Sequence, residues 1–266
     1  MAKERNPEID VPILGQYCHD CHNLALETFA PSISTNEADH FGFMAVCFVR
    51  TQLTHSESCL TLVNQNLLIG SEVIARVMLK GAILLAWAGL EPSIRPLRWR
   101  AFCLVLDWRT ICELESEGKT VDQNQKAEIE DRLREFPEFL TKKAHQHGCE
   151  KYKDPYQKTW TVDSDGAKLS IPQMATELKD PNLKLLYDSL SQHIHWTPLG
   201  FGQGIKRSDD RVSISFNTSR LCAQVLSAHF LALVTTFNAA AQHFNLPNLV
   251  KLHQLVKNYQ ADMTGA

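Results

Sequence analysis

The stretch Ser71-Glu-Val-Ile-Ala-Arg-Val-Met-Leu-Lys-Gly-Ala-Ile-Leu-Leu-Ala-Trp87 is apolar on nearly every face of a helix. Such a helix is typically buried on all sides, so the pattern predicts a central core helix surrounded by other helices. Gly89 and Pro92 follow it and end it. It carries two cations, Arg76 and Lys80, which are four residues apart and therefore share one face.

Helical periodicity continues on both sides of this segment. We expect helices at residues 11–29, 37–64 (capped by Ser34 or Asn36), 96–117, 121–147 (kinked at Pro137), 171–178, 181–195 and 215–244, and a last one ending near Lys257. Residues 158–170 suit either a short hairpin or a mobile loop, and residues 196–211 are expected to form a loop. The sequence thus predicts an all-α protein, a single bundle of about seven or eight helices.

The length of 266 residues suits one large domain. We expect residues 1–266 to form it, with a peripheral N-terminal helix in residues 1–35. The core bundle then covers residues 37–245, and residues 246–266 form a C-terminal helix and tail.

The composition is that of a soluble globular protein, with 44% hydrophobic and 21% charged residues. The net charge of -3 gives no general attraction to nucleic acid or anionic membrane, so RNA contact needs a local basic patch. The N-terminus lacks an apolar signal segment, and the apolar run at residues 82–90 is too short to span a bilayer. We therefore expect a cytoplasmic protein that does not engage membranes, with its eight cysteines mostly reduced.

Arg76 and Lys80 are costly to bury in an apolar helix unless they are paired. One interpretation is a salt bridge to an acidic partner, with Glu72, Asp107 and Asp188 as candidates. The other is an anion-binding pair at the bottom of a cleft. The sequence leaves both open.

The densest group of titratable and hydroxyl side chains lies at residues 185–196. Tyr187, Ser191 and His195 are spaced four apart, so they form one polar stripe on a helix, with Asp188 near the same side and His193 off it. A histidine at a helix C-terminus that titrates near neutrality suits general acid–base catalysis. A hydrogen-bond network that fixes the helix end to the core is an equally good explanation.

A further motif, Cys18-His-Asp-Cys-His22, has the spacing of covalent haem attachment, which requires an oxidising compartment. Zinc suits Cys18, Cys21 and His22 better, with His145-Gln-His-Gly-Cys149 as a second half-site. No second Cys-x-x-Cys is present, so buried cysteines with surface histidines are the simpler interpretation. Arg50 and His55 are likewise read as a solvated surface pair. We predict no cofactor.

Three segments together carry a resemblance: Ile74-Ala-Arg-Val-Met-Leu-Lys80, Ser170-Ile-Pro-Gln-Met-Ala-Thr-Glu-Leu178 and the Tyr187-x3-Ser191-x3-His195 stripe. They resemble a bacterial all-helical family known only as a domain of unknown function, over about residues 40–240. In that family the central helix carries Arg and, four residues on, Glu. Lys80 replaces the Glu here and makes the site more positive.

Residues 190–195 are also similar to the signature of the HEPN superfamily of helical nucleotide-binding and ribonuclease domains. Ser191 and His195 match it, but Leu190 stands where the catalytic Arg belongs, so Arg76 would have to replace it. The resemblance implies metal-independent RNA cleavage, homodimers and toxin or anti-phage roles. It implies catalytic roles for His195, Arg76, Tyr187 and Ser191, and ligand contacts from Lys80, Asp188 and His193. The alternatives are a non-catalytic module that binds a protein or an anionic ligand, and a small zinc protein.

Overall fold

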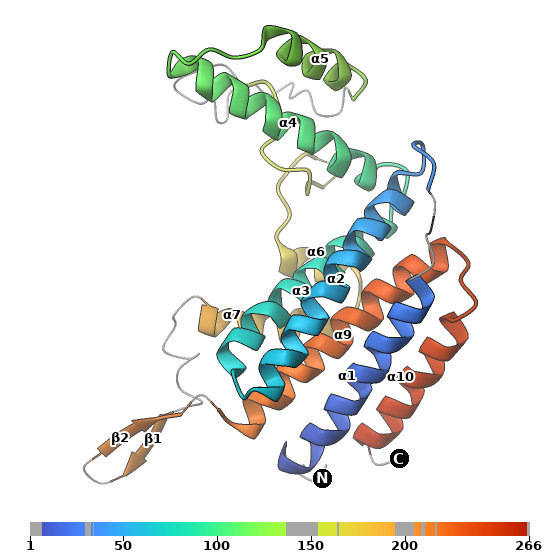
Figure 1. Ribbon diagram of the computed structural model, residues 1–266, viewed down its shortest axis with the longest axis vertical. Helices are drawn as coiled ribbons and strands as arrows, with labels where there is room; N and C mark the ends of the chain where they lie inside the picture. The colour runs from blue at the N-terminus through green and yellow to red at the C-terminus, as the bar shows by residue number, and fades with distance from the viewer. Residues whose placement is uncertain are drawn as a thin grey trace. The chain divides into compact units, whose positions relative to one another are not determined.

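The computed structural model describes residues 7–29, 33, 35–136, 154–163, 165–194, 205–208, 211–215 and 217–264. The chain divides into two compact units. The first contains Met1–Trp87 and Ile171–Ala266, and the second contains Ala88–Ser170. Helices dominate both units, so the all-α prediction is confirmed (Figure 1).

The first unit is a helical bundle built around one long helix near the end of the chain. Its helices are α1 (Pro7–Phe29), α2 (His40–Asn64), α3 (Leu68–Gly89), α6 (Ile171–Glu177), α7 (Pro181–Ile194), α9 (Ser219–His243) and α10 (Leu249–Thr264). α9 packs against α1, α2, α7 and α10, and α1, α9 and α10 run side by side in Figure 1. The core of this unit therefore centres on α9, with Leu233, Phe237 and Ala240 almost completely buried.

α3 is held against α2, but it is not buried all round. Gln52 of α2 donates from Nε2 to the Met78 carbonyl at 2.7 Å. The inner face of α3 is fully buried, with Ala75, Met78, Leu79, Ala82, Ile83 and Leu85 at 0% exposure. Its outer face leaves Ile69, Val73 and Val77 at 40–43% exposure. The prediction of a helix buried on every side is therefore wrong for one face, because α9 and not α3 occupies the centre.

Several predicted boundaries also change. Asp39, not Ser34 or Asn36, caps α2: its carboxylate accepts the Gly42 amide at 2.8 Å. Asn36 lies one turn earlier and accepts the Asp39 amide at 2.7 Å, so it orients the cap, while Ser34 lies outside the described residues. α10 continues to Thr264, past the expected end near Lys257.

The N-terminal helix is an integral part of the first unit rather than a peripheral element. Leu14, Cys18 and Cys21 of α1 are at most 1% exposed against α2 and α9. Tyr17 of α1 donates to Asp262 of α10 at 2.6 Å. Burial and this neighbouring carboxylate raise the pKa of Tyr17 to about 12, so it stays a neutral donor.

A short antiparallel hairpin replaces part of the loop expected at residues 196–211. β1 (Ile205–Ser208) pairs with β2 (Arg211–Ile214), with Ile205 opposite Ile214. The rest of that loop, residues 196–204 and 209–210, lies outside the described residues. Lys206, Arg207, Ser208 and Arg211 are polar residues that suit a two-stranded hairpin as well as a loop, so the local composition did not separate the two.

α9 is also the one helix of the described chain that is long and apolar enough to cross a membrane by length and composition. In its most apolar window, 61% of the helix is buried inside the protein. Core helices of globular bundles have the same composition, and the packing of α9 against four other helices accounts for it.

The second unit is a pair of helices, α4 (Arg95–Ser116) and α5 (Gln123–Arg134), with an irregular segment beside α4. Trp108 of α4 donates to Glu130 of α5 at 2.9 Å. The Pro137 kink predicted for the second helix lies outside the described residues. The hairpin expected near residues 158–170 is present as one antiparallel bridge between Val162 and Lys168.

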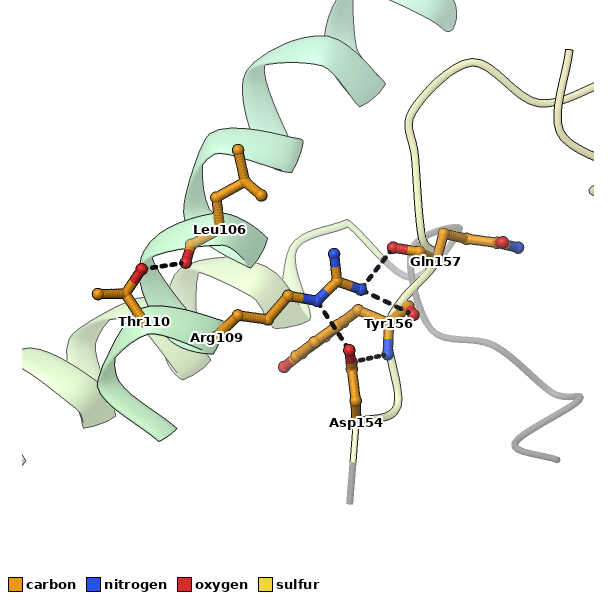
Figure 2. A network of polar contacts seen from close by, with 6 residues as sticks. All are labelled: Leu106, Arg109, Thr110, Asp154, Tyr156 and Gln157. Carbon is orange, nitrogen blue, oxygen red and sulfur yellow. Dashed lines mark hydrogen bonds and ion pairs between the residues drawn. The ribbon is translucent and has the colours of Figure 1, made fainter. Parts of the chain in front are cut away.

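Arg109 fixes the irregular segment to α4 (Figure 2). Its Nε donates to Asp154 at 2.7 Å, and its Nη2 donates to the carbonyl oxygens of Tyr156 and Gln157 at 3.2 and 2.7 Å. Asp154 in turn accepts the Tyr156 amide at 2.9 Å. The guanidinium also lies 5.8 Å from the centre of the Phe102 ring. The contacts all lie within this unit, which indicates a structural role for Arg109.

Replacing Arg109 by alanine is therefore expected to release residues 154–163 from α4. The loss of three hydrogen bonds, one of them to a charged partner, should lower the free energy of unfolding by roughly 2–4 kcal/mol. Amide exchange over residues 154–163 should rise while that of α9 stays unchanged. Thr110→Ala is the control, because the Thr110 hydroxyl donates to the Leu106 carbonyl of the same helix, and equal effects at both positions would contradict this assignment.

Candidate functional site

Arg76 of α3 joins the polar stripe of α7, although more than a hundred residues separate them. Its Nε donates to Ser191 Oγ at 2.9 Å, and its Nη2 donates to the Tyr187 hydroxyl at 3.1 Å. The guanidinium carbon lies 4.8 Å from the centre of the Tyr187 ring. The cation thus lies against an aromatic face and is oriented by two hydroxyl groups.

The two hydroxyls have different hydrogen-bond states. Ser191 Oγ donates to the Tyr187 carbonyl at 2.6 Å, so its hydrogen is already engaged when it accepts from Arg76. The Tyr187 hydroxyl accepts from Arg76, and its own hydrogen is left to donate to another acceptor. A phosphate oxygen beside Arg76 would be such an acceptor.

The face of α3 that carries Arg76 is amphipathic. Val73, Arg76, Val77 and Lys80 follow the i, i+3, i+4, i+7 spacing of one helix face. Val73 and Val77 are 43% and 42% exposed, Lys80 is exposed and Arg76 is half-buried. Two cations therefore flank an accessible apolar surface, which fits a ligand that has both an anionic and an apolar part.

The remaining predicted site residues divide into two groups. Asp188 forms an exposed ion pair with Lys184 at 2.7 Å, so it is engaged with its own helix. Asp107, another proposed partner of Arg76, belongs to the second unit, and Glu72 is 1% exposed. His195, residues 196–204 and the side chain of His193 lie outside the described part of the chain.

A second polar cluster lies in the core of the first unit. Ser56 Oγ of α2 is 2.8 Å from Nδ1 of His22 on α1 and 2.8 Å from Nε2 of His229 on α9. Ser56 and His229 are fully buried, whereas His22 is half-buried. We call His22, Ser56 and His229 the relay. Nδ1 of His229 has no hydrogen-bond partner within the described structure.

Burial dominates the electrostatics of the relay. It lowers the pKa of His229 to about 3 and also lowers the pKa of His22, while Glu57 acts in the opposite direction on His22. Both rings are therefore neutral at pH 7. Nothing in the spacing of His22, Ser56 and His229 along the sequence predicts that they meet.

The cysteines of the N-terminal motif are buried, as the simpler interpretation expected. Cys18 is fully buried and donates to the Leu226 carbonyl at 3.2 Å, and burial raises the pKa of Cys21 to about 12. In the residues that the structure describes, no three His, Cys, Asp or Glu side chains are grouped so that they hold a metal ion. Residues 145–149, the proposed second half-site, lie outside them.

Within the described ranges of the chain, no hydrogen bond or ion pair joins Arg50 or His55 to the Arg76 site or to the relay. Arg50 is exposed and His55 is half-buried on α2. This agrees with a solvated position for Arg50.

The sequence pattern of DUF5677, described as a family of unknown function, matches residues 42–212. The matched range lies within the 40–240 span of the resemblance and includes Arg76, Tyr187, Ser191 and Ser56. α1, α9 and α10 lie outside it. No curated protein and no solved structure matches the chain.

Proposed function

We propose, starting from the membership of this chain in the DUF5677 family of unknown function, that the Arg76 site binds a phosphate of RNA or of a nucleotide. One observation carries the proposal: Arg76 reaches Tyr187 and Ser191 on the stripe that ends at His195. The contact supplies the charge that the HEPN-like signature lacks at Leu190.

A nucleotide suits the site better than a bare anion. The guanidinium of Arg76 binds phosphate in a planar, multidentate manner, and Lys80 adds a second charge on the same face. Val73 and Val77 offer apolar surface next to both cations. A ribose or base can cover that surface while the phosphate contacts Arg76.

The proposed reaction is metal-independent RNA cleavage. The ribose 2′-oxygen forms a bond to the adjacent phosphorus and the bond from phosphorus to the 5′-oxygen breaks, which yields a 2′,3′-cyclic phosphate and a 5′-hydroxyl. His195 accepts the proton of the 2′-hydroxyl and returns it to the leaving 5′-oxygen. Arg76 and Lys80 stabilise the negative charge that develops on the phosphorane oxygens. We place this activity in the cytoplasm, in a homodimer and in a toxin or anti-phage role.

Expression in a heterologous host tests catalysis. Induced wild-type protein should slow growth and fragment total RNA, and His195→Ala should abolish both, because it removes the proton acceptor. The fragments should carry cyclic phosphates at their 3′ ends. If intact RNA and normal growth accompany both proteins, the cleavage proposal fails.

The second candidate is a non-catalytic module that binds an anionic ligand. The hydrogen bonds between Arg76 and two hydroxyls favour it, since they fix α3 to α7 whether or not chemistry occurs. Binding of a fluorescent oligoribonucleotide to purified wild-type and His195→Ala proteins separates the two. If wild type and His195→Ala bind the oligoribonucleotide equally and neither cleaves it, the protein is a non-catalytic binding module.

A further inference from the structure

The relay connects the family region to helices that lie outside it. Ser56 belongs to the matched residues 42–212, whereas His22 and His229 lie on α1 and α9 beyond its two ends. The relay shares no residue with the Arg76 site, so an inference about it does not depend on the proposed function.

The single hydroxyl hydrogen of Ser56 couples the two rings. Ser56 can donate to only one of them, so it must accept from the other. In one arrangement His229 donates from Nε2 to Ser56, and Ser56 donates to Nδ1 of His22. In the reverse arrangement His22 donates to Ser56, and Ser56 donates to His229.

The two arrangements differ at the buried end of the relay. In the first, Nδ1 of His229 carries no hydrogen. In the second, the hydrogen of the neutral His229 ring must be on Nδ1, where the described structure offers no acceptor. A buried N–H group without an acceptor is rare and destabilising. The first arrangement is therefore the stable one while both rings are neutral.

Protonation of His22 forces the second arrangement. A doubly protonated imidazole carries a hydrogen on each nitrogen, so Nδ1 of His22 becomes a donor to Ser56. The Ser56 hydroxyl then turns to Nε2 of His229, and the His229 hydrogen must be on Nδ1. A charge at the half-buried end thus produces an unpartnered donor in the core without adding a proton to His229.

Ionisable groups of α1 and α2 act on the two rings of the relay. Glu57 of α2 favours the charged form of His22, and His19 of α1 opposes it. On α10, Asp262 is hydrogen-bonded by Tyr17. Burial raises the pKa of the nearby thiols, so they remain neutral at pH 5–8: Cys18, Cys59 and Cys222. His22 is half-buried whereas His229 is fully buried, so His22 is the ring of the relay that takes up a proton first as the pH falls.

We propose that the relay is a pH-sensitive latch, which weakens the packing of α1 on α2 and α9 when His22 becomes protonated. The latch would loosen the N-terminal helix from the family region under mild acid. It acts through hydrogen-bond direction, because the buried ring changes its tautomer and not its charge.

The test follows both the tautomers and the helix. Nitrogen-15 NMR of labelled histidine in the full chain should show His229 changing from the Nε2–H to the Nδ1–H tautomer between pH 8 and 5, with the same midpoint as protonation of His22. Amide exchange of α1, corrected for the intrinsic effect of pH, should rise about tenfold over that range relative to α4.

Ser56→Ala should break the coupling, so that the His229 tautomer no longer follows His22. Ser58→Ala is the matched control, because Ser58 is an exposed serine of the same helix that donates to the Thr54 carbonyl. If Ser56→Ala does not fold, His22→Asn serves instead and should fix one His229 tautomer across the range. A His229 tautomer that stays constant while wild-type His22 titrates would overturn the proposal.

Discussion

Replacing Arg76 by alanine is expected to weaken RNA binding and any RNA cleavage at least about a hundredfold, as removal of a charged donor to a phosphate or an oxyanion does. Arg76 is the residue through which the two halves of the proposed site meet, since it donates to both Tyr187 and Ser191. Binding of an oligoribonucleotide, measured at fixed salt, and cleavage in a single-turnover assay report the effect.

Arg50→Ala is the matched control for charge. It removes the same positive charge from an exposed position on α2 and should change binding less than about twofold. Arg76→Lys should fall between wild type and alanine, because a lysine keeps the charge but does not present the planar set of donors that reaches two hydroxyls. If Arg76→Ala and Arg50→Ala bind RNA equally well, the site is misassigned.

Arg76→Ala also has a structural effect that must be separated from the loss of ligand. Two hydrogen bonds between α3 and α7 disappear, which should lower the free energy of unfolding by roughly 1–3 kcal/mol. Tyr187→Phe removes only one of them and retains the ring under the cation. If the Tyr187→Phe variant stays folded but no longer binds the oligoribonucleotide, the phenolic hydrogen of Tyr187 is a ligand contact.

The free energy of unfolding is expected to fall by about 1.4 kcal/mol for each pH unit below 6.5 through His229 alone. Its pKa is about 3 in the folded protein and 6.5 when the ring is solvated. Below pH 6.5 the unfolded chain takes up a proton at this position and the folded chain does not, so acid favours unfolding. The effect continues until about pH 3 and therefore approaches roughly 5 kcal/mol. The lowered pKa of His22 acts with the same sign.

Denaturant unfolding at pH 8, 6 and 5 measures this dependence. His229→Gln is the informative variant, because its amide can replace the hydrogen bond to Ser56 and cannot titrate. In this variant, the slope of the unfolding free energy against pH should correspond to about one fewer proton taken up on unfolding, whatever its stability at pH 8. An unchanged pH dependence in His229→Gln would assign the acid sensitivity to other groups.

Sequence reasoning succeeded where the information was local. The helical periodicity of α1, α2, α4 and α9 predicted their existence, and the four-residue spacing of Tyr187 and Ser191 correctly placed both hydroxyls on one face. Arg76 lies 2.9 Å from Ser191 of that stripe, whereas His195, on which the predicted catalytic role depends, lies outside the described residues. The distance between Arg76 and this stripe depends on how α3 packs against α7, and no local sequence pattern contains that information.

The misses have a common physical cause. The apolar residues of α3 predict burial on every face. Hydrophobicity alone does not determine which of two apolar helices lies at the centre of a bundle, and here α9 lies there. His22, Ser56 and His229 are polar residues in three separate helices, and each alone is typical of a surface. The cluster becomes visible only when the three helices are assembled.

The central helix of the first unit, α9, lies outside the residues that match the family pattern. Residues 42–212 contain nearly all of α2 and the whole of α7, but both helices pack against α9, which lies beyond the matched range. A fragment cut to those residues would expose apolar side chains of both helices to water. The residues that match the family pattern therefore leave out the helix against which α7, and with it Tyr187 and Ser191 of the Arg76 site, packs.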